Sequence, residues 1–355
     1  MTEPRVGRSA GKVRAARLTD LAALGELSRL CQSGRADTRS LGLPVSGPRI
    51  GMFSLFRLPL GAFRPNDLLF VYEDQRRVAG LVRVERESSR DEWTIVELDA
   101  IGHADAGDIR FRLIQHLLRD GSKRGASRFH VACADADGNV ELFMQGGFAR
   151  YGEEGLYFRP PGSDLPAPWS EKHMAAMRLR PVGPTDSVAL MRLYGAVTPV
   201  PVQRLEAVRL SDWERHGQTL RVPRSSLAPI LRFADVETYV QAAPDGGKDG
   251  TELSALIQLG VAKEDQPHYL KVMARPDFDI APLVEFGLGA IGAQTARGSD
   301  PRRDHGVLAP VRTYEAPVNN RLEEAGFEAV ATVTLLLKET LVRVAEPALV
   351  PAGVR

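Results

Sequence analysis

Hydrophobic and polar residues follow two spacings along the chain, and these spacings predict an alternation of strands and helices. Between Leu21 and Leu30, apolar residues recur every three or four positions, which predicts a helix that Thr19 or Asp20 can cap. Short apolar runs predict strands at 13–18, 68–72, 78–85, 93–101, 128–133 and 155–158. A helix is predicted before each of the last two strands.

The second half repeats this order with a longer insertion after its first helix. Its predicted strands lie at 177–180, 236–242, 253–261, 269–274, 306–308 and 330–337, and its predicted helices at 187–196, within 202–216, at 279–291 and before Gly326. The stretch 159–170 contains four prolines and no apolar periodicity, which is typical of a domain linker. We therefore predict domains over 1–160 and 176–345, joined by a linker over 161–175.

A weak internal repeat supports this division. The stretch 139–148 returns as 318–327, displaced by 179 residues, and both copies end in Gly-Phe before a last strand. The offset is about half the chain, whereas short repeat arrays have periods of roughly 20–50 residues. Gly147 and Gly326 are therefore predicted to end equivalent helices in a left-handed conformation, because the following phenylalanine must turn back into the sheet.

Composition limits the class of protein. A chain of 355 residues exceeds the roughly 250–300 at which single cores stop growing, so two domains are expected. The 46 basic and 45 acidic residues give no overall field for nucleic acid or an anionic membrane. No apolar run approaches the roughly 20 residues of a membrane span. Two cysteines in a chain of this length fit a reducing compartment, so we expect a cytoplasmic protein.

Sequence motifs for metals and nucleotides are missing. The seven histidines form no His-x-x-x-His pair, and there is no Cys-x-x-Cys, so no metal is expected. The Gly-Leu-Gly-Ala-Ile-Gly run at 287–292 falls within a predicted helix rather than between a strand and a helix. We interpret it as a site of close helix packing and not as a nucleotide fingerprint.

The order of elements, with a Gly-Phe helix end before the last strand, resembles the GNAT acetyltransferase superfamily. The resemblance covers nearly the whole chain and implies an α/β protein of two tandem GNAT-like domains, each with a mixed sheet. It also implies that acetyl-CoA is the cosubstrate. In the family, an Arg/Gln-x-x-Gly-x-Gly/Ala loop and the start of the following helix hold the cosubstrate's pyrophosphate, as expected at a positive helix end.

Neither half carries that glycine loop intact. In the first half, by resemblance, the cofactor-binding positions are Ile101, Gly102, His103, Ala106, Gly107 and Arg110. Asp105 and Asp108 also stand on this stretch, and the alternative is that they cap the helix themselves. The second-half stretch 275–282 has no glycine, and Pro282 would remove an amide donor there, so it is expected to be the weaker site.

Candidate catalytic groups are few. The family often uses a tyrosine as general acid, but the matching positions hold Phe143 and Leu322, which cannot donate a proton. In the strand 93–101, alternation places Trp93, Ile95, Glu97 and Asp99 on one predicted face. Glu97 and Asp99 could activate an amine through water, or they could be solvated carboxylates on an open sheet face.

These observations lead to two hypotheses. The first is an N-acyltransferase that moves an acetyl or acyl group from acyl-CoA to a small-molecule or peptide amine, with Glu97 or Asp99 as base and the amides near Ile101 and Gly102 polarising the carbonyl. The second is a catalytically inactive GNAT-fold protein that binds a ligand or a partner protein. The missing glycine loop and tyrosine favour the second, while the preserved order of elements permits the first.

Overall fold

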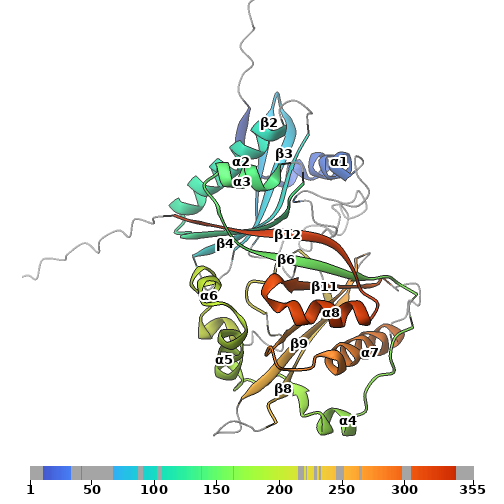
Figure 1. Cartoon of the computed structure of the whole chain (residues 1–355). Coiled ribbons are helices and arrows are strands. Elements are labelled where there is room, and N and C mark those ends of the chain that lie inside the picture. Colours follow the sequence, from blue (N-terminus) through green and yellow to red (C-terminus); the bar gives the residue numbers. More distant parts are fainter. Residues whose placement is uncertain are drawn as a thin grey trace, which may run out of the picture.

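A computed structural model describes residues 11–32, 41, 67–86, 91–101, 106–136, 138–162, 164–214, 220, 222–227, 230–231, 233–244, 252–263, 266–297 and 305–340. They form one 12-stranded mixed sheet with helices on its faces (Figure 1). The first-half elements are β1 Lys12–Ala15, η1 Leu18–Asp20, α1 Leu21–Gln32, β2 Asp67–Asp74, β3 Arg77–Arg86, β4 Glu92–Ala100, α2 Ala106–Lys123, β5 Arg128–Ala134, α3 Asn139–Gln145 and β6 Ala149–Arg159.

The second-half elements follow the same order. They are α4 Glu171–Ala176, β7 Leu179–Pro181, α5 Ser187–Val197, α6 Val200–Glu206, η3 Leu210–Trp213, β8 Phe233–Ala242, β9 Leu253–Ala262, β10 His268–Ala274, α7 Ala281–Arg297, β11 Val307–Arg312, η4 Thr313–Glu315, α8 Ala316–Glu324 and β12 Glu328–Glu339. The predicted mixed α/β class is therefore confirmed. The predicted linker contains most of the short helix α4, and the predicted helix within 202–216 is replaced by the shorter α6 and η3.

The two halves exchange their last strands. The strand order is β1-β2-β3-β4-β5-β12-β6-β11-β10-β9-β8-β7, so β12 lies beside β5, and β6 lies beside β11. Both β12 and β6 cross between the two lobes in Figure 1. The predicted strand at 155–158 lies within β6, which pairs with β12 and β11 and not with β5 of its own half.

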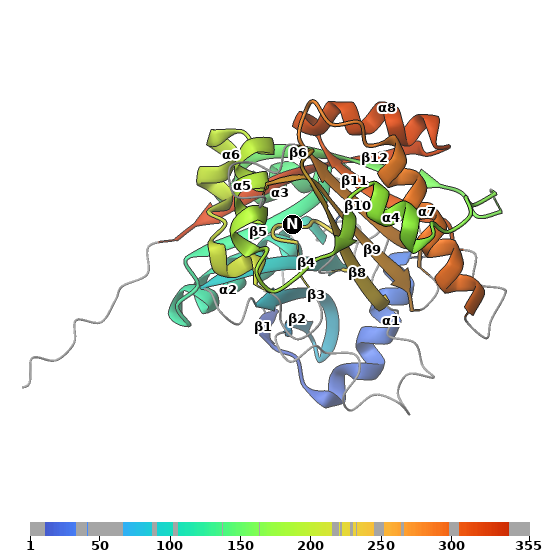
Figure 2. The same cartoon turned by 90° about the horizontal axis from the view of Figure 1, so that it is seen from below.

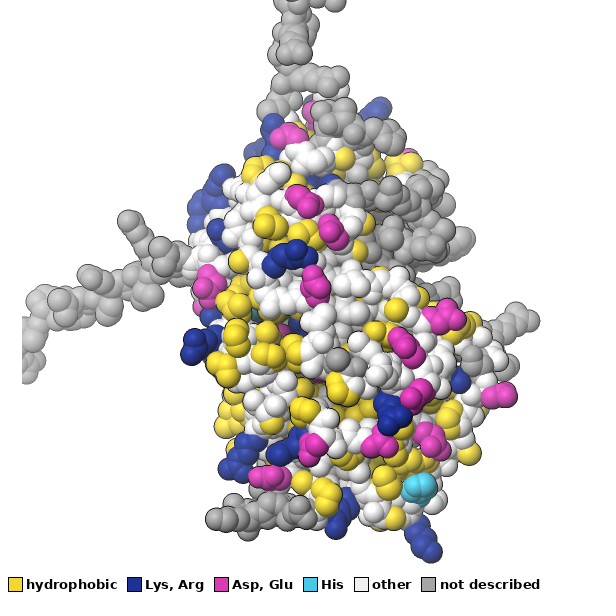
Figure 3. Space-filling model, viewed as in Figure 1, with side chains coloured by type: hydrophobic (Ala, Val, Ile, Leu, Met, Phe, Trp, Pro, Cys, Tyr) yellow, Lys and Arg dark blue, Asp and Glu magenta, His cyan; other side chains and the backbone are white. Residues whose placement is uncertain are grey.

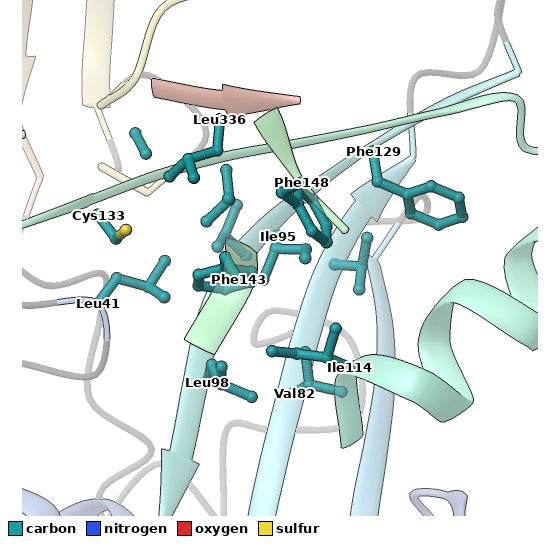
Figure 4. Close-up of a cluster of buried hydrophobic side chains, with 14 of the residues drawn as sticks. Leu41, Val82, Ile95, Leu98, Ile114, Phe129, Cys133, Phe143, Phe148 and Leu336 are labelled. Atoms are coloured by element: carbon teal, nitrogen blue, oxygen red, sulfur yellow. The ribbon is translucent and has the colours of Figure 1, made fainter. Parts of the chain in front are cut away.

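Each central helix packs its apolar stripe on the sheet of its own half, as the periodicity predicts. From α2, Leu113, Ile114 and Leu117 are buried in the largest core cluster, part of which is drawn in Figure 4. On α7, the glycine run makes close contacts: a Cβ at Gly287 would lie 2.8 Å from Leu270, and one at Gly289 would lie 2.8 Å from the Ala167 carbonyl oxygen. The interpretation of this run as close packing is confirmed.

Buried charges join the two halves. The Arg312 guanidinium of β11 lies 3.0 Å from Glu154 of β6 and 3.2 Å from Glu206 of α6. Arg224 forms an ion pair with Glu92 of β4, and its Nε donates to the Glu206 carbonyl oxygen at 3.0 Å. Because the acidic partners come from both halves, these contacts fix how the halves sit together, and Figure 2 shows α6 close to β6.

The outer surface mixes charges of both signs. On the face in Figure 3, basic and acidic side chains are interspersed rather than gathered by sign. Among the described residues, no helix combines the length and the apolar character that crossing a membrane requires.

Candidate functional site

The candidate site lies where two parallel strands of the first half diverge. β4 and β5 are paired only over Glu92–Ile95 and Arg128–Val131. β4 then continues to Ala100 and β5 to Ala134 without pairing to each other. Divergence leaves backbone donors and acceptors on the facing edges of both strands, and such an edge can pair with an extended ligand. Ligands of α/β sheets also bind at the carboxyl ends of strands.

A β-bulge at Val96 shapes the diverging part of β4. Arg83 of β3 is opposite Glu97, but the next residue, Val84, is opposite Ile95, so Val96 is the extra residue. The bulge reverses the alternation of side chains beyond it. Opposed residues share a face, and Val84 and Ile95 lie in the core cluster that contains the α2 residues, while Glu97 lies with Arg83 on the other face. The prediction that Trp93, Ile95, Glu97 and Asp99 share one face is therefore wrong.

Glu97 and Asp99 themselves do share a face, on the side of the sheet that α1 covers. Asp99 is opposite Leu81, which packs with α1, and it is only 8% exposed. It is therefore not the solvated carboxylate of the alternative interpretation. Burial, together with the nearby charges of Asp99 and Glu97, raises the pKa of the Cys31 thiol of α1 to about 12.

Arg83 fixes the position of Glu97. Its Nε donates to Glu97 Oε2 at 2.9 Å, and its NH1 lies 3.4 Å from Asp67 Oδ2. A guanidinium held between two carboxylates restricts the rotamers of both. Nothing in the spacing of the sequence marked Arg83, because its role depends on the register between β3 and β4.

The cofactor positions predicted by resemblance are only partly suited to that role. The Ile101 amide donates to the Ala79 carbonyl oxygen at 2.9 Å, so the expectation that it polarises a substrate carbonyl is wrong. Gly107 in the first turn of α2 is exposed, and a Cβ there would meet nothing within 4 Å, so ligand atoms can approach it closely, while its neighbour Ala106 is half-buried. Gly102 and His103 lie outside the described residues.

Charged side chains at the start of α2 already have partners. Arg110 NH1 donates to Asn139 Oδ1 at 2.7 Å and so links α2 to α3. Asp108 and Arg112 form an exposed ion pair of 2.7 Å. The structure does not describe Asp105, so its predicted cap stays a prediction. A phosphate at this helix end would have to share Arg110 with Asn139.

The corresponding gap in the second half is bridged by a side chain. β10 and β11 pair only through His268 and Tyr269, but the register of β9 and β10 runs without a bulge. Buried Lys271 donates from Nζ to the Pro310 carbonyl oxygen of β11 at 3.3 Å and to Glu315 at 2.7 Å. β10 therefore lacks the bulge that β4 has, and a side chain joins it to β11.

The start of α7 agrees with the sequence prediction. Asp279 Oδ1 accepts a hydrogen bond from the Ala281 amide at 3.2 Å, and Pro282 occupies the first turn. The Ala281 amide is thus already paired, and Pro282 has no amide hydrogen to donate. Both facts disfavour binding of an anion at the start of α7.

The two positions at which the family often has a tyrosine are core residues. Phe143 and Leu322 both have no exposed surface, and each accepts the amide of its Gly-Phe phenylalanine through its carbonyl oxygen. Neither side chain can donate a proton. Among the described residues, no group of three or more His, Cys, Asp or Glu side chains could hold a metal ion.

One residue at the site carries no signal in the sequence. The Leu41 carbonyl oxygen accepts the Ala134 amide at 2.8 Å, and its side chain lies in the core cluster with Cys133 (Figure 4). Leu41 follows α1 by nine residues and precedes β2 by 26, in a stretch without periodicity. Only the folded chain brings it to β5.

Comparison with known proteins bears on the fold. No protein-family model and no curated protein matches the sequence. A similar solved structure is a GCN5-related N-acetyltransferase from Sphaerobacter thermophilus, with 13% sequence identity, a TM-score of 0.53, and coverage of 93% of this chain and 96% of that chain. A tandem GNAT protein from the clavulanic acid biosynthesis pathway has 12% identity, a TM-score of 0.51, and coverage of 93% of this chain and 98% of that chain. A candidate acetyltransferase from Pyrococcus horikoshii has 10% identity, a TM-score of 0.51, and coverage of 96% of this chain and 94% of that chain. Identities this low establish the fold alone.

Proposed function

Because the chain has the fold of tandem GNAT proteins, we propose that its first half is an N-acyltransferase that transfers an acetyl or acyl group from acyl-CoA to a small-molecule or peptide amine. The observation that carries the proposal is the bulged, diverging end of β4 beside β5. It supports the first half over the second, in which Lys271 bridges the gap.

Glu97 and Asp99 are the proposed general base. An amine must lose a proton when its nitrogen attacks a thioester carbonyl, and a carboxylate can take that proton through water. Both side chains lie on one face of β4, just beyond the bulge. Arg83 would hold Glu97 in place while it does so.

The residues at the start of α2 fit acyl-CoA only in part. Gly107 offers close backbone approach at the start of α2, beside half-buried Ala106, and Arg110 offers a positive charge that it now directs at Asn139. When bound, acyl-CoA supplies the activated acyl group. The exposed Asp108 would weaken binding of its phosphates, although Arg112 offsets that charge.

Two measurements test the proposal. Calorimetric titration with acetyl-CoA and with free CoA should give one site per chain, because Lys271 joins β10 to β11 in the second half, whereas no described side chain joins β4 to β5 beyond their paired part. Release of the CoA thiol should then depend on added amine, tried as small primary amines and as peptides with free N-termini. Absence of both binding and amine-dependent thiol release would refute the acyltransferase.

The inactive alternative is favoured by a specific observation, since Phe143 fills the place of the usual acid and has no exposed surface. In that case the first half binds a ligand or a partner protein without chemistry. CoA binding without thiol release for any amine would support this second function.

We further propose that the protein is cytoplasmic. Two cysteines in a chain of 355 residues fit a reducing compartment. A fusion of the chain to a compartment-specific fluorescent reporter tests this location.

A further inference from the structure

Leu41 occupies the edge of β5 that faces the candidate gap. β12 pairs with β5 along its other edge from Arg128 to Ala134. The Ala134 amide, which donates to the Leu41 carbonyl oxygen at 2.8 Å, therefore lies on the edge that β4 leaves free beyond Ile95. At this point Leu41 takes the place that a neighbouring strand would have.

The side chain of Leu41 strengthens this contact. It is only 1% exposed and belongs to the first-half core cluster, where Figure 4 labels it with Cys133 and Phe143. Burial of a leucine is favourable, and the paired Ala134 amide avoids the cost of an unsatisfied buried donor. Leu41 is thus held through both its backbone and its side chain.

A ligand that binds along this edge needs the same donor. The arm of acyl-CoA is an extended chain with two amide groups, which is the chemistry that adds to a free strand edge. The arm and Leu41 cannot both accept the Ala134 amide in this geometry. Resting on the proposed function, we propose that Leu41 is an autoinhibitory contact, which competes with the acyl-CoA arm for the gap between β4 and β5.

Because of this competition, the apparent affinity is the intrinsic affinity multiplied by the fraction of molecules in which the gap is open. A smaller side chain at position 41 should raise that fraction. Leu41→Ala should therefore bind acetyl-CoA at least about tenfold more tightly than the unaltered protein, measured by calorimetry on the full chain. Leu117→Ala is the matched control, because Leu117 is an equally buried leucine of the same cluster that lies on α2, away from Ala134.

Hydrogen exchange supplies a readout that needs no ligand. In Leu41→Ala the Ala134 amide should exchange faster, while the Val131 amide, which lies in the paired part of β5, should keep its protection. Leu41→Val keeps a branched apolar side chain, and it replaces Leu41→Ala as the test variant if the alanine variant does not melt cooperatively. It should change affinity and exchange in the same direction by a smaller factor.

Each outcome decides the proposal. Tighter acetyl-CoA binding by Leu41→Ala, absent in Leu117→Ala, together with faster exchange at Ala134, supports the autoinhibitory contact. Equal binding by the unaltered protein and Leu41→Ala overturns it and leaves the acyltransferase standing. Failure of both proteins to bind acetyl-CoA at millimolar concentration overturns both proposals, and unchanged exchange at Ala134 shows that Leu41 does not hold that edge.

Discussion

Gly147 and Gly326 share a φ angle of 83°, although they lie 179 residues apart and in different halves. In each copy the phenylalanine amide that follows bonds back five residues, and the glycine amide bonds back three, which is a Schellman helix end. The strand that the other half supplies covers each end: Lys338 of β12 reaches Gly147, and Arg159 of β6 donates to the Ala325 carbonyl oxygen at 2.9 Å. The exchange of strands is thus reciprocal.

Replacing either glycine by alanine should destabilise the protein. A positive φ is unfavourable for alanine, so Gly147→Ala and Gly326→Ala should each lower the free energy of unfolding by on the order of 1 kcal/mol. Steric clashes should add little to this loss of stability. The Cβ of Gly147→Ala would meet the flexible end of the Lys338 side chain, and the Cβ of Gly326→Ala would lie at an ordinary contact distance of 3.6 Å from Arg159. Urea denaturation measures the change.

Gly195 in α5 is the control for these two variants. A Cβ there would meet nothing within 4 Å, and its φ is not positive. Gly195→Ala should therefore stabilise the helix by roughly 0.5–1 kcal/mol. Destabilisation of the same size at all three positions would contradict the assignment of the helix ends.

The exchanged strands predict how a divided chain behaves. Division at Pro166 separates β12 from β5 and β6 from β11, so each fragment lacks a strand whose apolar side chains complete its core. We expect fragments 1–166 and 167–355 to melt cooperatively only after they are mixed. Differential scanning calorimetry on each fragment and on the mixture measures this.

The domain boundaries at 160 and 176 stay a prediction until this experiment is done. Two separate cooperative transitions from monomeric fragments would show that each half can close its sheet with its own last strand. That result would mean that β6 can take the place of β12 beside β5.

Local signals in the sequence were sufficient for most elements of the fold. The spacing between Leu21 and Leu30 identified α1, and the Gly-Phe pairs identified two helix ends, because both signals depend on neighbours along the chain. The exchange of β6 and β12 was not predictable in this way. Either strand presents an apolar pattern that fits beside β5, and long-range packing decides between them.

The site was less predictable, since it depends on register. The bulge at Val96 reversed the faces beyond it and separated Glu97 from Ile95, and strict alternation has no way to signal an extra residue. The expected role of the Ile101 amide failed because Ala79 of β3 accepts it. Glu97 and Asp99 as base, and Gly107 as a phosphate neighbour, stay predictions.

Removal of Arg312 should cost more stability than removal of an exposed arginine. Glu154 and Glu206 are both buried, and Arg312→Met would leave them without their cation. Breaking a buried pair in this way costs about 3–5 kcal/mol. Arg321→Met is the control, because Arg321 pairs with Asp279 and Glu324 on the surface and should show no measurable change in urea denaturation. Equal effects would contradict the importance of the buried contacts.

His130 should make stability depend on pH. Burial lowers its pKa below the ordinary value of 6.5, although its contact with Glu92 at 3.2 Å opposes this, and nearby Arg224 and Arg128 add to the lowering. The unfolded chain therefore binds a proton more readily than the folded protein. Stability from this group is present above the unfolded pKa and falls as the pH is lowered through about 6.5 toward the folded pKa.

His130→Gln should therefore flatten the pH dependence of the free energy of unfolding between about pH 7 and pH 5. His116→Gln is the necessary comparison, because partial burial also lowers the pKa of His116. A pH profile that His130→Gln leaves unchanged would show that this histidine is not protonated differently on unfolding.

The final prediction concerns the proposed base. Glu97→Gln and Asp99→Asn keep the size of each side chain but remove its ability to take a proton, so transfer from acetyl-CoA to an amine should fall by roughly 10²–10⁴-fold for the residue that acts as base. Acetyl-CoA affinity should stay within about twofold, since neither carboxylate is placed among the groups that would bind it. Glu73→Gln, on β2 beside the edge strand β1 and paired with Arg14, is the matched control and should keep full activity. A fall in affinity that accounts for the whole loss of rate would instead assign Glu97 or Asp99 to binding, and full activity in both variants would exclude either as the base.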